Sequence, residues 1–203
     1  MLVKLYEENT NERELNKICD LLRSGGIIIY PTDTVYSIAC DIKNIRGIEK
    51  IAKIKGVKFE NANFSIICND LSNISEYAKL HDKSLFKLLK RNLPGPFTFI
   101  LNASNNVPKI FKSKKKTIGI RVPNNNIALK LVENLGNPIV SSSIHDIDDI
   151  VEYSTDPELI YERYCDTVDI VIDGGPGGNI ASAIIDCTGD EFEILREGEK
   201  ELI

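Results

Sequence analysis

The sequence has few of the residues on which most nucleophilic and metal sites depend. Only two histidines occur among 203 residues, and neither lies near a cysteine or a Gly-x-Ser-x-Gly motif, which argues against a hydrolase triad. The five cysteines are widely scattered and form no Cys-x-x-Cys pair. We therefore expect reduced, mostly buried thiols, with no disulfide framework and no metal site built from protein side chains.

Long apolar runs are also lacking. The longest candidates, such as residues 25–30, have the length of one strand, whereas a membrane span needs about 18 apolar residues. The N-terminus lacks the basic-then-apolar pattern of a signal peptide, so we expect a cytoplasmic protein that does not bind membranes. Because no repeat or linker divides the chain, we predict one domain over residues 1–203.

Helices and buried strands alternate along the chain, which predicts an α/β fold. An Asn9-x-x-Glu12 capping box opens a helix that ends at Gly25-Gly26, and the β-branched run at 27–30 is typical of a strand buried on both faces. The two strands expected at 97–101 and 117–122 have no helix between them, which favours an antiparallel pair. We predict a twisted mixed parallel and antiparallel sheet with flanking helices. Further helices are expected after Asn44, Asp82 and Asp156 and at 127–135, and further strands at 64–68, 138–141, 168–172, 183–186 and 192–195.

The common phosphate-binding motifs are absent. There is no P-loop, and Gly175-Pro-Gly177 lacks the third small residue of a dinucleotide fingerprint. Instead, Pro31-Thr-Asp-Thr-Val-Tyr36 directly follows the buried strand at 27–30, and in α/β sheets the strand ends are where ligands bind. This segment could carry function, or Thr32 or Asp33 could merely cap a turn or helix.

Cations and hydroxyls stand at other ends of predicted elements. Lys55 and Lys58 follow the second helix, while Arg121, Ser141-Ser-Ser143 and Arg196 close or follow strands. Guanidinium, ammonium and hydroxyl groups suit polyphosphate, although each residue alone could be an ordinary surface group. We expect them to converge on one anion-binding hollow.

Charge is unevenly distributed along the chain. Residues 79–121 contain eleven Lys or Arg and one acid, whereas residues 145–203 contain seventeen acids and three Lys or Arg. The segregation indicates a basic surface that could attract phosphates, or simply two solvated faces.

Several short motifs, in this order, resemble the YrdC/YciO family, which includes the threonylcarbamoyl-AMP synthases also called TsaC. The similarity spans nearly the whole chain, and residues 63–77 look most like the YciO branch. The motifs are Pro31-Thr-Asp-Thr-Val-Tyr36, Pro94-Gly-Pro-Phe-Thr98, Thr117-Ile-Gly-Ile-Arg-Val-Pro123, Gly136-Asn-Pro-Ile-Val-Ser-Ser142, Ser182-Ala-Ile-Ile-Asp186 and Ile194-Leu-Arg-Glu-Gly198.

The resemblance implies a concave basic cavity in which L-threonine, bicarbonate and ATP, the last with Mg²⁺, form threonylcarbamoyl-AMP and pyrophosphate for the t6A modification of tRNA. It implies that the threonine contacts are Thr32, Thr34, Arg121 and Ser141. It also implies that ATP and its phosphates contact Lys55, Lys58, Asn61, Ser143, Ser182 and Arg196. The metal ion would be held by phosphates and water rather than by protein side chains.

This chain departs from the family at three points. The usual Lys-x-Arg and Ser-x-Asn patterns are replaced by Lys55-Gly-Val-Lys58 and Ser141-Ser-Ser143, and Ser37 replaces a glycine. If Lys58 takes the place of the arginine, charge is kept but the bidentate fork is lost, and if Val57 does, the charge is lost as well. The alternative function is therefore a YciO-type nucleotide-binding protein associated with RNA or ribosomes, with weak or no synthase activity.

The RNA hypothesis rests on the basic segment. Its candidate contacts to tRNA or double-stranded RNA are Lys112, Lys114, Lys115 and Lys116, which could equally form a solvated loop. The phenylalanines of the segment are expected in the core rather than at an RNA surface, and the helix after Asp82 is expected to turn Leu85, Phe86, Leu88 and Leu89 inward.

Overall fold

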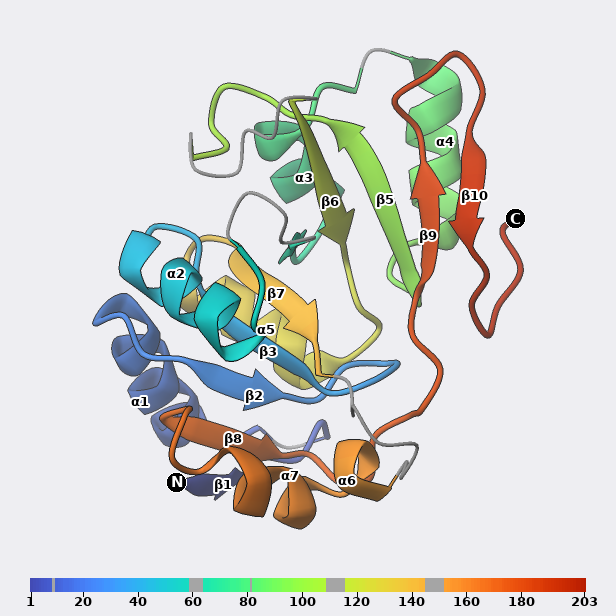
Figure 1. Cartoon of the computed structure of the whole chain (residues 1–203). Coiled ribbons are helices and arrows are strands. Elements are labelled where there is room, and N and C mark those ends of the chain that lie inside the picture. Colours follow the sequence, from blue (N-terminus) through green and yellow to red (C-terminus); the bar gives the residue numbers. More distant parts are fainter. Residues whose placement is uncertain (9, 59–63, 81, 109–115, 145–151) are drawn as a thin grey trace.

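The computed structural model describes residues 1–8, 10–58, 64–80, 82–108, 116–144 and 152–203 (Figure 1). Its strands are β1 (Leu2–Lys4), β2 (Ile28–Tyr30), β3 (Ser37–Asp41), β4 (Ser65–Ile67), β5 (Phe97–Asn102), β6 (Thr117–Arg121), β7 (Ile139–Ser143), β8 (Ile170–Asp173), β9 (Ala183–Asp186) and β10 (Glu193–Arg196). Its helices are α1 (Glu12–Arg23), α2 (Ile45–Ile54), α3 (Leu71–Tyr77), α4 (Lys83–Asn92), α5 (Asn126–Leu135), α6 (Glu152–Thr155) and α7 (Pro157–Tyr164).

All ten strands form one sheet in the order β1-β8-β2-β3-β7-β4-β6-β5-β9-β10. The pairs β1·β8, β2·β8, β4·β6 and β5·β9 are parallel, and the other five pairs are antiparallel. The mixed sheet is therefore confirmed, as is the antiparallel pairing of β5 with β6.

Helix starts follow the capping residues in the sequence. Asn44, Asp82 and Asp156 each accept a backbone N–H of the following turn, as predicted. The capping box at Asn9 is wrong: Asn11 caps α1, and its Oδ1 accepts from Arg13 N at 3.0 Å and Glu14 N at 3.4 Å. Glu12 is therefore the first helical residue and not the third.

Four elements were not predicted from the sequence. They are β1, β3, α3 and the four-residue helix α6. The strand β3 is buried throughout but is built of Ser, Ile, Ala, Cys and Asp, so it lacks the β-branched run that marks a strand. The helix α3 spans seven residues and buries only Ile74, too little for a helical period to be visible.

The helices cover the two faces of the sheet unequally. On one face α1 and α5 pack over Ile28, Tyr30 and Ala39 in a cluster that also includes strand residues from β1 and β8. On the other face α2, α3, α4 and α7 pack along the sheet, from Val171 through Cys40 and Ile66 to Ile185. The second core is therefore the longer one.

The face under α1 and α5 changes character halfway across the sheet. Along one row of paired residues it passes from Ile28 and Ala39 to Ser141, Ser65 and Gly119. Thr98 of β5 and Arg121 of β6 lie on the same face, because their neighbours Phe97, Phe99 and Ile120 point into the opposite core. We call Ser65, Thr98, Gly119, Arg121 and Ser141 the polar half of this face, and the part under α1 and α5 the covered half.

Some core predictions are corrected. Phe97 and Phe99 are buried as expected, but Phe86 is 43% exposed, because the buried stripe of α4 runs through Leu85, Leu88 and Leu89 and leaves Phe86 beside it. Cys19, Cys40 and Cys68 are buried free thiols, whereas Cys165 is exposed.

Candidate functional site

The loop between β2 and β3 is shaped by its own hydrogen bonds. Thr34 N donates to Thr32 Oγ1 at 3.1 Å, and Thr32 Oγ1 in turn donates to Val35 O at 2.8 Å. Both threonines are buried. Residues 31–36 belong to no helix, so the helix-cap alternative for Thr32 and Asp33 does not hold, whereas Thr32 does stabilise a turn. The loop is a compact turn that presents hydroxyls at the end of β2.

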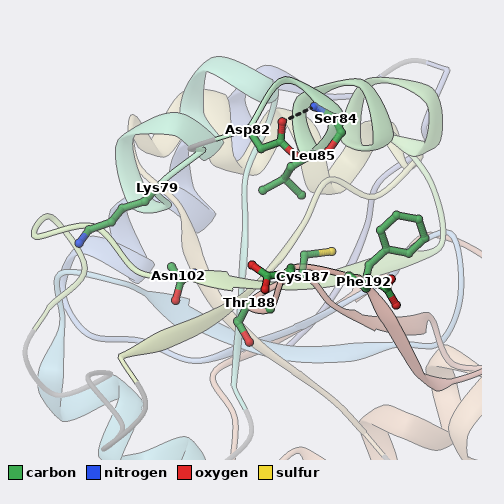
Figure 2. Close-up of a pocket in the computed structure, with 11 residues that line it drawn as sticks. Lys79, Asp82, Ser84, Leu85, Asn102, Cys187, Thr188 and Phe192 are labelled. Carbon is green, nitrogen blue, oxygen red and sulfur yellow. Dashed lines mark hydrogen bonds between the residues drawn. The ribbon is translucent and has the colours of Figure 1, made fainter.

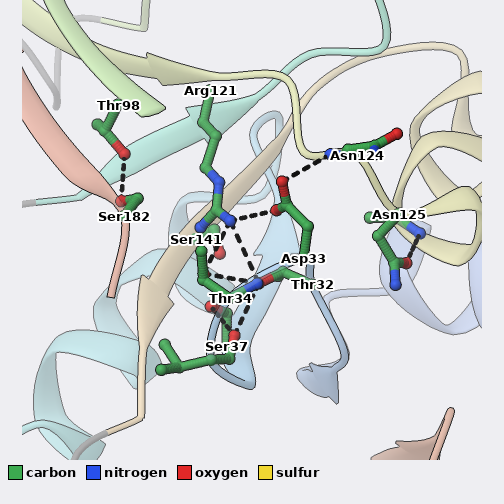
Figure 3. Close-up of polar contacts among 12 residues, drawn as sticks. Thr32, Asp33, Thr34, Ser37, Thr98, Arg121, Asn124, Asn125, Ser141 and Ser182 are labelled. Carbon is green, nitrogen blue, oxygen red and sulfur yellow. Dashed lines mark hydrogen bonds and ion pairs between the residues drawn. The ribbon is translucent and has the colours of Figure 1, made fainter. Parts of the chain in front are cut away.

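Arg121 ends β6 and reaches into this loop (Figure 3). Its Nη2 donates to Thr34 Oγ1 at 2.8 Å and to Thr32 Oγ1 at 3.4 Å, and it forms an ion pair with Asp33. The other oxygen of Asp33 accepts from Asn124 N at 2.9 Å. Both side chains of the pair are nearly inaccessible, at 7% and 11% exposure, so the pair is shielded from screening by solvent.

The Nε atom of Arg121 makes fewer hydrogen bonds than its Nη2 atom. Every side-chain hydrogen bond described for Arg121 comes from Nη2, and the buried Nε has no partner among the described residues. An unpaired buried donor costs free energy that a bound acceptor would recover. A carboxylate or phosphate oxygen is a suitable acceptor for Nε–H, because hydrogen bonds between a guanidinium and an anion are charge-assisted.

Ser141 lies in the same polar half, on β7. Its Oγ is 2.8 Å from the hydroxyl of Tyr30, and both residues are buried. Burial raises the pKa of Tyr30 to about 12, so the phenol stays protonated at neutral pH. The hydroxyl pair gives Ser141 a fixed direction beside Arg121 in Figure 3.

Ser182 and Arg196 form a second polar group. Ser182 Oγ is 2.8 Å from Thr98 Oγ1, while its carbonyl accepts from Arg196 Nε at 3.0 Å and Nη2 at 2.8 Å. Burial and then repulsion from Arg121 lower the pKa of Arg196. An anion bound near both arginines would relieve that repulsion.

Lys55 contacts Ser143, which lies two residues after Ser141 at the end of β7. Lys55 Nζ donates to Ser143 O at 2.6 Å, and burial lowers the pKa of Lys55. Lys58 is exposed, and no described contact brings it to the other predicted site residues. Asn61 lies outside the described residues.

The predicted RNA contacts are mostly outside the described part of the chain. Lys112, Lys114 and Lys115 are not described, and Lys116 is exposed immediately before β6. A basic row that the lysine-loop hypothesis did not use lies on α4, where Lys83, Lys87, Lys90 and Arg91 are all exposed.

A hollow of about 330 Å³ lies elsewhere, between α4 and the turn that joins β9 to β10 (Figure 2). No predicted site residue lines it. Its charged residues are Lys79, Asp82, Asp190 and Glu191, three acids to one base. An anionic ligand would be repelled there, so we place the candidate site at Arg121. The basic cavity that the resemblance implies stays a prediction.

Sequence reasoning missed three functional neighbours. Asp33 stands between Thr32 and Thr34, and the presence of an acid inside a predicted anion site was the available signal. Tyr30 and Thr98 had no local signal, because their partners Ser141 and Ser182 are 111 and 84 residues away.

The described residues contain neither a membrane-spanning helix nor a cluster of metal-ligating side chains. No described helix has the length and apolarity to cross a membrane. Within the same residues, no group of three or more His, Cys, Asp or Glu side chains could hold a metal ion.

Comparison with known proteins bears on this site. A family model for Sua5, YciO and YrdC, described as "Telomere recombination", matches residues 20–198. Escherichia coli YciO, described as uncharacterized, is 38% identical over 96% of this chain and 93% of its own length. Its crystal structure superposes with a TM-score of 0.90 at 37% identity, covering 99% of this chain and 97% of that one.

Two relatives carry functional names. A Bacillus subtilis threonylcarbamoyl-AMP synthase is 28% identical over 95% of this chain but only 55% of its own length. The crystal structure of Pyrococcus abyssi Sua5 complexed with L-threonine has a TM-score of 0.85 at 26% identity, covering 98% of this chain and 57% of that one. The chain therefore spans little more than half of these two relatives. From the family model and the near full-length match to YciO, the chain belongs to the Sua5/YciO/YrdC family.

Proposed function

We propose that this protein forms L-threonylcarbamoyl-AMP and pyrophosphate from L-threonine, bicarbonate and MgATP. The observation that carries the proposal is the buried Arg121, whose Nη2 is held by Thr34 and Asp33 while its Nε has no described partner. An amino-acid carboxylate satisfies that donor. The named synthases and the Sua5 structure with L-threonine support the choice of amino acid.

The proposed reaction needs orientation and charge neutralisation more than acid–base side chains. The threonine amine and bicarbonate form a carbamate with loss of water. A carbamate oxygen then attacks the α-phosphorus, and the bond to pyrophosphate breaks. Arg121 and Thr34 would hold the threonine, while Arg196 and Lys55 would stabilise charge on the phosphates. Magnesium would enter with ATP as part of that substrate.

The test is direct synthesis with labelled bicarbonate, threonine, ATP and Mg²⁺. We expect labelled threonylcarbamoyl-AMP together with pyrophosphate. Arg121→Lys keeps a positive charge opposite Asp33 but loses the parallel N–H edge, so we expect about 100-fold weaker use of threonine. Lys50→Ala, which removes an exposed cation of α2, is the matched control and should behave as wild type. Absence of both products under conditions in which a known synthase works would overturn the proposal.

A second candidate function is RNA binding, favoured by the exposed row Lys83, Lys87, Lys90 and Arg91 on α4. If this row contacts RNA phosphates, changing three of its lysines to alanine should reduce the salt slope of duplex-RNA binding by about three. Lys50→Ala again serves as control. An unchanged slope would remove α4 from the RNA hypothesis.

A further inference from the structure

The connection from β8 to β9 crosses the loop that carries Thr34. The two strands stand second and ninth in the sheet order, so the chain between them must pass most of the sheet (Figure 1). We call residues 174–178, Gly-Gly-Pro-Gly-Gly, the glycine strap. It lies against the loop formed by residues 31–36.

Hydrogen bonds tie the strap at both of its ends. Gly174 N donates to the hydroxyl of Tyr36 at 3.2 Å, and that hydroxyl donates to Gly175 O at 2.7 Å. At the far end Gly178 N donates to Thr34 O at 2.7 Å. The strap is thus fixed to the first and last parts of the segment 34–36.

Three glycines of the strap have a close neighbour, and a Cβ on the first, Gly174, would lie 2.6 Å from Pro31 Cγ. A Cβ on Gly178 would lie 2.5 Å from Thr34 O and 3.2 Å from Thr34 C, and one on Gly177 would lie 2.6 Å from Tyr36 Cδ2. Neither residue has a positive φ. The atoms that face Gly178 are backbone, which cannot rotate away as a side-chain tip can, so a methyl group there must displace Thr34.

Thr34 is consequently held from two sides. Its carbonyl is fixed by Gly178, and its hydroxyl lies 2.8 Å from Arg121 Nη2 and 3.0 Å from Thr32 Oγ1. A shift of the carbonyl moves the hydroxyl as well, because both belong to one buried residue. The strap therefore sets the distance between Thr34 and Arg121 although none of its own side chains enters the site.

We propose that Gly178 is a positioning residue for the amino-acid part of the site, acting through Thr34. This inference rests on the proposed function for the identity of the ligand, threonine. It does not concern the nucleotide part, because Lys55 and Arg196 make no described contact with the strap.

The first experiment compares Gly178→Ala with Gly189→Ala. A Cβ on Gly189 meets only Glu191 O at 3.5 Å, and its φ is not positive, so it is the matched glycine without a close neighbour. We expect Gly178→Ala to weaken threonine binding, measured by calorimetry, about tenfold or more and to leave ATP binding within about twofold. Gly189→Ala should match wild type for both ligands. Equal weakening of threonine and ATP binding by Gly178→Ala would overturn the positioning role.

A second readout does not depend on the ligand. Amide hydrogen exchange of peptides covering residues 31–37 should rise in Gly178→Ala and stay unchanged in Gly189→Ala. If wild-type protein binds no threonine, the proposed function fails while exchange still decides whether the strap holds the loop. Unchanged exchange in residues 31–37 would overturn the inference itself.

A gentler variant guards against misfolding of Gly178→Ala. Tyr36→Phe removes the hydroxyl that joins the strap at Gly174 and Gly175 and introduces no clash, so we expect a smaller loss of threonine affinity, about threefold. In a Thr34→Ala background, Gly178→Ala should add little further loss, because the positioned hydroxyl is already gone. Full additivity of the two changes would contradict action through Thr34.

Discussion

The sheet face that α1 and α5 partly cover is apolar in one half and polar in the other. In the covered half, Ile28 and Tyr30 are buried under α1 and α5 and extend the core. In the polar half, Ser65, Gly119 and Thr98 occupy the equivalent positions. The backbone pairing continues across the boundary without interruption. The two halves therefore differ in their side chains and in the cover by α1 and α5, and not in strand pairing.

The two halves also differ in how deeply their strands are buried. Every residue of β2 is buried, whereas β5 alternates between buried and half-buried residues. A strand enclosed on both faces contributes mainly to stability, and a strand with one polar face can contribute polar groups to a ligand. We conclude that substitutions in the covered half should change folding and those in the polar half should change binding.

The largest expected effect is on folding, in the covered half. Leu131 of α5 is fully buried in the cluster beneath that face. Leu131→Ala removes buried methyl groups and leaves a cavity, so we expect the free energy of unfolding to fall by about 2–5 kcal/mol. Urea denaturation measures this change. Threonine affinity of the remaining folded protein should be unchanged, and a large loss of affinity would break the division between the halves.

The converse experiment fills the polar half. A Cβ on Gly119 would lie 3.4 Å from Ser65 Cβ and 3.5 Å from Thr98 Cγ2, so alanine fits there. Gly119→Leu places a larger side chain over the face, and we expect binding of threonine or ATP to weaken at least about tenfold, roughly 1.4 kcal/mol. Gly119→Ala is the control and should fold as wild type. If Gly119→Leu binds both ligands normally, the ligand does not occupy this half.

A smaller effect is expected at the boundary between the halves. Tyr30 belongs to the covered half, but its hydroxyl contacts Ser141 of the polar half. Tyr30→Phe removes one buried hydrogen bond, which we expect to lower the free energy of unfolding by about 1 kcal/mol. A double-mutant cycle with Ser141→Ala measures the coupling. Additive effects would mean that the hydroxyl pair does not join the two halves.

The sequence predicted the helices and strands better than it predicted the contacts between residues that lie far apart along the chain. The run at 27–30 identified a doubly buried strand, and Asn44, Asp82 and Asp156 identified three helix starts. The segment 31–36 and Arg121 were also found, because local residue types marked them. The pairing of Arg121 with Asp33 and of Tyr30 with Ser141 depends on strand order, which no local pattern contains.

The smallest effect concerns pH at the edge of the polar half. In the ligand-free protein, burial lowers the pKa of Lys55 below the ordinary value for a lysine, and a bound phosphate would favour its charged form. ATP affinity should thus be constant below this lowered pKa and fall as pH rises through it, beginning at a lower pH than for an exposed lysine. We expect ATP affinity to fall by a few-fold.

Lys55→Arg keeps its charge throughout this pH range, so the ATP affinity of this variant should not fall there. Calorimetric titrations at increasing alkaline pH measure both profiles, with Lys50→Arg as the exposed control. Identical profiles for wild type and Lys55→Arg would place Lys55 outside the phosphate site, and the phosphates would then have to be bound by other residues than Lys55.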